Sequence, residues 1–174
     1  MANNFQLISS STVGSGGSTS IDFTSIPSTY TDLCIKVSAR SDTSDITDLA
    51  MRLNGDTASN YFYLELTGNA SSASSGSGNP SRLNTILPGN TNVTANIFNN
   101  VEIYITNYAS SNQKTISTDA VTENNSTSTN VQQRLQAWRW SGTSAITSVS
   151  LYPPAVGVKF LQYTTAYLYG ISKS

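Results

Sequence analysis

The stretch "FTSIPSTYTDLCIKVSARS", residues 23–41, decides the fold class of this chain. A Pro-Ser-Thr turn leads into strict alternation of side chains over the next eight residues. Leu33, Ile35, Val37 and Ala39 point one way, and Cys34, Lys36, Ser38 and Arg40 point the other way. A period of two with one apolar face predicts a half-buried β-strand. We therefore expect Leu33, Ile35 and Val37 to lie in the core.

Short segments with the same period recur along the chain, and clusters of Ser, Thr, Gly, Asn and Pro separate them. No segment shows a helical period over three turns. The pattern predicts an all-β protein of about ten short strands, in an antiparallel β-sandwich that is jelly-roll-like, with two four-stranded sheets. An immunoglobulin-like sandwich is the alternative, but the strands exceed seven and the Cys-Trp-Cys pattern is absent. The expected strands lie at 5–8, 20–23, 33–40, 49–53, 61–66, 101–105, 114–123, 133–140, 146–152 and 160–170.

The 174 residues suit one domain, residues 1–174, with a core of its own. Residues 9–20 are expected to form a flexible connection, and "NGD" at residues 54–56 is expected to form a tight hairpin turn. Residues 68–99 are longer than a compact domain normally leaves irregular. We expect a short strand near "RLNTIL" in this stretch, and a surface loop in its Ser/Gly half. The N-terminal segment 1–20 and the loop 68–99 are the expected contact elements.

The composition excludes several classes of partner. Charged residues make up 11% of the chain and the net charge is −1, so no basic face is available for nucleic acid. The surface is instead expected to consist of the 29 serines, 22 threonines and 17 asparagines. The N-terminus lacks the pattern of a secretion signal, and no run approaches the ~18 apolar residues of a membrane span. We expect the protein to be made in a cytoplasm and to have no membrane partner.

Candidate chemistry is sparse. The chain has no histidine, so a Ser-His-Asp or Cys-His catalytic arrangement is excluded, and no cofactor motif occurs. We expect no enzyme activity, no cofactor and no metal, and a structural role for Cys34. Two alternatives stay open. A carboxylate pair among Glu65, Glu102, Asp119 and Glu123 could hydrolyse glycosidic bonds, and Asp42, Asp45 and Asp48 could hold Ca²⁺, although aspartates are ordinary turn residues.

The aromatic residues allow two interpretations. Trp138 and Trp140 share one face of their strand, and Tyr163, Tyr167 and Tyr169 share one face of the last strand. Either set could form a platform that stacks sugars. The favoured interpretation is that these rings fill the core or an oligomer interface, because aromatic rings bury a large apolar area.

Several quoted segments together resemble a family of small virion structural proteins of tailed bacteriophages, found in phages of cyanobacteria and other aquatic bacteria. The segments are "SIDFTSIPSTYTDLCIKVSARS", "MRLNGDTASNYFYLEL", "VEIYITNYASSNQKTISTDAVTENN", "SVSLYP" and "FLQYTTAYLYGIS". The most specific pieces are "IP-x-TY-x-DL", "NGD-x-x-SNY" and "Y-x-x-AYLYGI", and none of them is a catalytic motif. The match covers nearly the whole chain in order.

The resemblance implies a virion component: a jelly roll that sits on the head surface as an oligomer, often a trimer, and acts as a capsid decoration or cement protein. Its partners would be the major capsid protein of the same virion and further copies of the chain. A tail-fibre module that binds a receptor or carbohydrate is the alternative. The candidate contact residues are Phe5, Leu7, Ser75, Arg82, Trp138, Trp140 and Tyr167.

Overall fold

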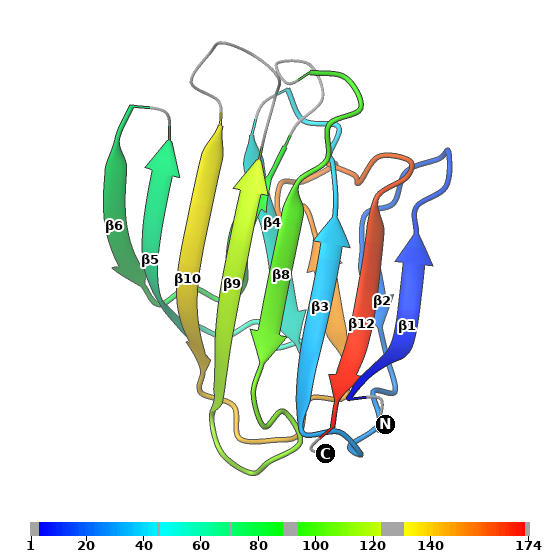
Figure 1. Ribbon diagram of the computed structural model, residues 1–174, viewed down its shortest axis with the longest axis vertical. Helices are drawn as coiled ribbons and strands as arrows, with labels where there is room; N and C mark the ends of the chain where they lie inside the picture. The colour runs from blue at the N-terminus through cyan, green and yellow to red at the C-terminus, as the bar shows by residue number, and fades with distance from the viewer. Residues whose placement is uncertain (1–3, 45, 70, 89–93, 123–130, 173–174) are drawn as a thin grey trace.

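The computed structural model describes residues 4–44, 46–69, 71–88, 94–122 and 131–172. These residues form an all-β sandwich of two antiparallel sheets, which confirms the expected fold class (Figure 1). The larger sheet has the strand order β1-β12-β3-β8-β9-β10-β5-β6, and the smaller sheet has the order β2-β11-β4-β7. The strands of the larger sheet are β1 (Phe5–Thr12), β3 (Asp32–Ser38), β5 (Tyr61–Asn69), β6 (Ala73–Gly78), β8 (Asn100–Ile105), β9 (Lys114–Thr122), β10 (Gln132–Trp140) and β12 (Thr165–Ile171). Those of the smaller sheet are β2 (Ile21–Phe23), β4 (Thr47–Leu53), β7 (Leu83–Leu87) and β11 (Val149–Tyr152).

The arrangement corrects three details of the sequence interpretation. The described residues form sheets of eight and four strands, not two sheets of four. Strand β1 extends to Thr12, so residues 9–12 belong to a strand and not to a flexible connection. The stretch 68–99 contains β6 as well as the expected strand at "RLNTIL", which is β7. Strand β6, "ASSGSG", has no apolar period and was therefore missed.

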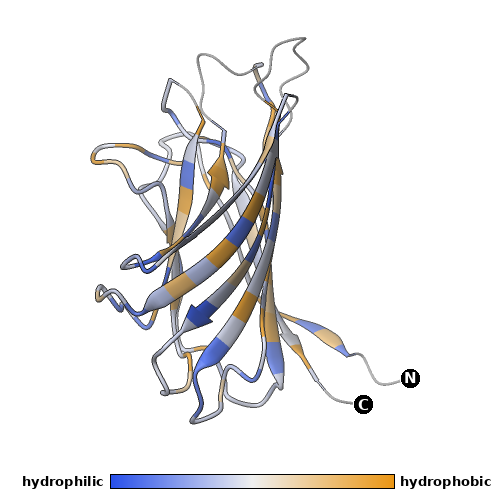
Figure 2. Ribbon diagram, turned by 90° about the vertical axis from the view of Figure 1, so that its left-hand side faces the viewer, coloured by the Kyte–Doolittle hydropathy of each residue, from blue (hydrophilic) through white to orange (hydrophobic). Residues whose placement is uncertain are grey.

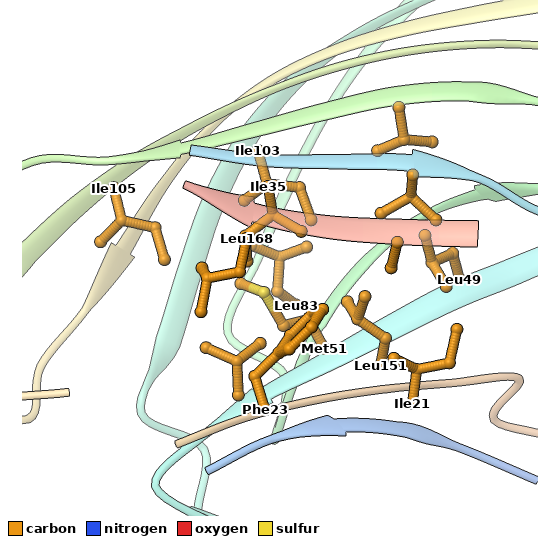
Figure 3. Packing of buried hydrophobic residues seen from close by; sticks show 14 of the residues in the cluster. Ile21, Phe23, Ile35, Leu49, Met51, Leu83, Ile103, Ile105, Leu151 and Leu168 are labelled. Carbon is orange, nitrogen blue, oxygen red and sulfur yellow. The ribbon is translucent and has the colours of Figure 1, made fainter. Parts of the chain in front are cut away.

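The core lies between the two sheets and is built from the alternating strands (Figure 3). Leu33 and Ile35 are fully buried and Val37 is 3% exposed, so the expected register of β3 is confirmed. Met51, Leu83 and the other inward residues of the smaller sheet pack against them. Cys34 faces the other side of the sheet but is also buried, because Tyr169 and Tyr104 are its cross-strand neighbours.

The smaller sheet covers only part of the larger one. It packs over β12, β3, β8, β9 and the end of β10 that carries Trp138 and Trp140, and the inward residues there are buried. Strands β6 and β1 at the two edges are mostly exposed. Polar side chains fill the inner face where the cover ends. Arg134 Nη1 lies 3.3 Å from Asp48 Oδ1, and Gln136 donates one hydrogen bond to Glu65 and accepts another from Thr118.

The turn after β4 joins the two sheets. Asn54 and Gly55 adopt the expected left-handed conformation, with φ of 51° and 67°. However, β4 and β5 belong to different sheets, so the expected hairpin is wrong. The Asn54 side chain instead accepts hydrogen bonds from the backbone N–H groups of Thr147 and Ser148, and this anchors the turn to the segment before β11.

The buried register of β3 generates the first prediction. Ile35→Asp places an unpaired carboxylate in the core, which a fold of ordinary stability does not tolerate. We expect no soluble folded protein from this variant. Ser38→Asp introduces the same group three residues later at an exposed position of the same strand and should change the free energy of unfolding by less than about 0.5 kcal/mol. Expression in the soluble fraction and urea unfolding measure both; a folded Ile35→Asp variant would contradict the register.

Candidate functional site

Strand β5 turns its leucines away from the core. Its inward residues are Tyr61, Tyr63 and Glu65, so Leu64 and Leu66 lie on the outer face of the larger sheet, 56% and 62% exposed. Leu135 of the neighbouring β10 pairs with Leu66 and is 43% exposed. Viewed from the β6 edge, hydrophobic and hydrophilic residues alternate along the nearest long strands, so one row of each strand faces outward (Figure 2). The result is a continuous apolar surface that no described part of the chain covers.

This surface forms the floor of a groove of about 800 Å³, which we call the outer groove. Leu64, Leu66, Leu135 and Ala137 form its floor. Residues 75–77 of β6 line one side, and Glu102, Ser117 and Asp119 of β8 and β9 line the other. Contiguous exposed apolar patches are typical of surfaces that contact another molecule.

The acidic side of the outer groove brings together two of the four carboxylates named in the hydrolase alternative. Glu102 and Asp119 are direct cross-strand neighbours, and both side chains face outward. Glu102 is already engaged, because Lys36 Nζ donates a hydrogen bond to Glu102 Oε2. Glu65, by contrast, lies on the inner face with Gln136 and Arg134 and is not part of this pair. Glu123 lies outside the described residues.

The N-terminal contact residues lie on the same outer face. Phe5 and Leu7 of β1 are both about half exposed, and Tyr167 of β12 is 38% exposed. The rings of Phe5 and Tyr169 are 6.2 Å apart, and those of Tyr167 and Tyr169 are 6.5 Å apart. A second apolar and aromatic area therefore lies at the β1 edge of the larger sheet.

The two tryptophans are not surface residues. Trp138 and Trp140 are 3% and 4% exposed and belong to the core, so their assignment as contact residues is corrected and the core interpretation is confirmed. Trp140 Nε1 donates a hydrogen bond of 2.7 Å to Asp56, and its ring leaves no room for a Cβ at Gly142. A position inside the sandwich explains why these large rings alternate with polar residues along β10.

The remaining candidates lie apart from one another. Ser75 lines the outer groove, but Arg82 lies next to β7 of the smaller sheet, where its Nε donates to Asn84 Oδ1. Tyr163 precedes β12 and has a φ of 71°, so it does not share a strand face with Tyr167 and Tyr169. This corrects the expectation that Tyr163 shares one strand face with the other two tyrosines.

The candidate metal and nucleophile groups have structural partners. Asp42 Oδ1 accepts a hydrogen bond from Lys159 N, Asp48 pairs with Arg134, and Asp45 lies outside the described residues. Within the described ranges no group of three or more Cys, Asp or Glu side chains is placed to hold a metal ion. Burial raises the pKa of the Cys34 thiol, with a smaller opposite effect of Lys36, so this thiol is poorly suited to act as a nucleophile.

Lys114 is a buried cation with a structural role. Its Nζ donates hydrogen bonds to the carbonyl groups of Ser110, Asn112 and Thr143, and it lies 5.9 Å from the centre of the Trp140 ring. These contacts fix the turn between β8 and β9. The group is therefore not a candidate for binding a ligand.

Comparisons of the chain with family models, curated proteins and solved structures found no match. The described residues contain no helix of the length and hydropathy needed to cross a membrane.

The exposed leucines generate the second prediction. Leu64→Ala and Leu66→Ala should each change the free energy of unfolding by less than about 0.5 kcal/mol, because neither side chain contributes to the core. Leu83→Ala, the matched change at a fully buried leucine, should cost about 2–5 kcal/mol. Urea unfolding of the three variants measures the difference. Equal losses at Leu66 and Leu83 would mean that the outer groove is covered in solution.

The Glu102 and Asp119 pair generates the third prediction. We expect the purified protein to release no reducing sugar from host surface polysaccharide, because Glu102 is held in an ion pair and both carboxylates face open solvent. EDTA should leave the fold unchanged. Turnover that disappears in Glu102→Gln or Asp119→Asn, but persists in Glu65→Gln, would establish the hydrolase alternative instead.

Proposed function

We propose that this protein is a non-enzymatic virion structural protein that docks on a capsid shell through the outer face of its larger sheet. The observation that carries the proposal is the outer groove, where Leu64, Leu66 and Leu135 remain exposed in a chain with only 11% charged residues. The resemblance of the sequence to phage virion proteins supplies the kind of partner. The proposed role is that of a decoration or cement protein on the head surface, with the major capsid protein as its partner.

The physical basis of docking is apolar burial. Each Å² of apolar surface removed from water contributes about 25 cal/mol, so covering three leucines stabilises a contact that needs no ion pairs. A contact of this kind tolerates salt, because screening weakens charged pairs and leaves apolar burial intact. If the protein docks as a homo-oligomer such as a trimer, several weak contacts act together through effective concentration.

A bound decoration protein stabilises the shell by mass action. It binds the assembled shell and not the separated subunits, so occupancy raises the free energy needed to open the shell. The pressure of packed DNA makes this stabilisation useful. Adsorption to the host does not enter this role, which separates it from the alternative of a tail-fibre or receptor-binding module.

The fourth prediction tests docking with a matched pair of variants. Leu64→Glu/Leu66→Glu places two carboxylates on the groove floor, whereas Val156→Glu introduces the same group at a fully exposed apolar residue of a loop. Both variants should melt like the unchanged protein. We expect the double variant to lose co-sedimentation with purified shells, and virions carrying it to release DNA at a lower temperature. The Val156→Glu variant should behave like the unchanged protein in both assays.

Adsorption to host cells is the second readout of the same experiment. Under the proposed role, adsorption is the same for all variants, and quantitative mass spectrometry finds hundreds of copies per particle. Normal heat stability combined with failed adsorption, or a dozen copies or fewer, would assign the protein to the tail and contradict the cement role.

A further inference from the structure

A second pocket, of about 400 Å³, lies at one end of the larger sheet. Strands β1 and β3 end there and β8 and β12 begin there, so four connecting segments meet around it (Figure 1). We call it the loop-end pocket. Its lining residues come from 15–17, from Arg40 and Asp42, from 95–98 and from 159–163. It shares no residue with the outer groove.

Two residues of the pocket wall have left-handed backbone conformations. Tyr163 has a φ of 71° and Asn96 a φ of 64°, in the left-handed region that side chains other than glycine rarely adopt. Asparagine tolerates this region, but tyrosine does not. The Tyr163 ring is also 67% exposed, so burial of the ring does not explain the conformation. Strain of this kind persists at ligand-binding sites, where it holds a side chain in place.

The surrounding segments hold the strained residue rigidly. Tyr163 N donates to Val13 O at 3.0 Å, and the buried Phe160 exchanges backbone hydrogen bonds with Ser18. Gly17 has a φ of 69°, and a Cβ at this position would lie 2.8 Å from Phe160 O, so only glycine fits. The pocket is therefore formed before any ligand binds, which lowers the entropy cost of binding.

Two cations and one carboxylate line the pocket within the described part of the chain. Lys159 and Arg40 line it together with one carboxylate, Asp42. Arg40 is 3% exposed, and its Nη1 donates to Thr94 O and Ile97 O. The Lys159 backbone N–H is bound to Asp42, while its ammonium group has no carboxylate partner in the described part of the chain. An anionic group on a ligand can therefore pair with the Lys159 ammonium group.

We propose that the loop-end pocket binds a saccharide that carries a carboxylate group. An exposed tyrosine ring offers a flat apolar surface for the C–H face of a pyranose ring. The side-chain amides of Asn96 and Gln162 offer donors and acceptors for its hydroxyl groups, and Lys159 offers a partner for its carboxylate. An inorganic anion would use only the cation and would leave the tyrosine ring without a role.

The test uses the full chain and isothermal titration calorimetry with three probes: tetragalacturonate, the neutral sugar maltotetraose, and inorganic phosphate. We expect tetragalacturonate to bind at least tenfold more tightly than either of the others. Tyr163→Ala should weaken its binding at least tenfold. Lys159→Met should remove the preference over maltotetraose. Tyr167→Ala, which removes an exposed tyrosine from the outer face, should bind like the unchanged protein.

Tyr163→Gly separates a binding role from a structural one. Glycine relieves the left-handed strain, so this variant should melt at a higher temperature and still lose tetragalacturonate binding. A purely structural role predicts a lower melting temperature. The proposal is overturned if tetragalacturonate does not bind, if phosphate or maltotetraose binds equally well, or if Tyr163→Ala binds like the unchanged protein. Leu64→Glu/Leu66→Glu should bind tetragalacturonate normally, so failure of capsid docking and failure of saccharide binding are distinguishable.

Discussion

The larger sheet is wider than the sheet that covers it, and the other features of the molecule depend on this mismatch. Four strands cannot cover eight, so the middle of the larger sheet is fully buried on its inner face, while β1 and β6 extend beyond the cover. Side chains alternate across a strand, so each strand must give one row to the inner face and one to the outer face. Strand β5 lies beside the β6 edge, where the core ends. Its inward row is Tyr61, Tyr63 and Glu65, whose polar groups can form hydrogen bonds at this boundary.

The inward row of β5 forms hydrogen bonds at the boundary of the core that leucine side chains could not form. Tyr61 is fully buried, and its hydroxyl accepts a hydrogen bond of 3.0 Å from Leu53 N, so it joins the larger sheet to the end of β4. Burial raises the pKa of Tyr61 to about 12, and the phenol therefore stays neutral over the physiological range. Further along the strand, Glu65 reaches Gln136 and Arg134 where the cover ends. If leucines occupied the inward row, Leu53 N, Gln136 and Arg134 would lose these partners. Because the polar row faces inward, Leu64 and Leu66 must face outward.

The alternation of apolar residues predicted where most strands lie. It predicted less well which row of a strand faces the core and which sheet the strand joins. The register of β3 followed directly from "LCIKVSA", because one face is apolar and the other is not. In "YFYLEL" both rows are largely apolar, and the period alone does not say which row faces the core. The same limit explains the turn at Asn54 and Gly55: local chemistry gave its φ values but not the fact that β4 and β5 join different sheets. No sequence pattern predicted the left-handed backbone of Tyr163, because tertiary contacts such as the hydrogen bond from Tyr163 N to Val13 O impose this conformation.

The two candidate surfaces differ in the physics that governs them. The floor of the outer groove is apolar, and Glu102 in its lining is already paired with Lys36. Contacts there depend on removing leucine surface from water, which ions in solution strengthen or leave unchanged. The loop-end pocket combines the exposed Tyr163 ring with the Lys159 ammonium group, for which the described residues provide no carboxylate partner. A charged ligand there is therefore sensitive to screening over the Debye length of about 10 Å at 0.1 M salt. Because they share no lining residue, one surface can hold a partner while the other stays open to solvent. A chain docked by its outer face on a large assembly would thus keep the loop-end pocket, with Tyr163 and Lys159 in its lining, available for a second ligand.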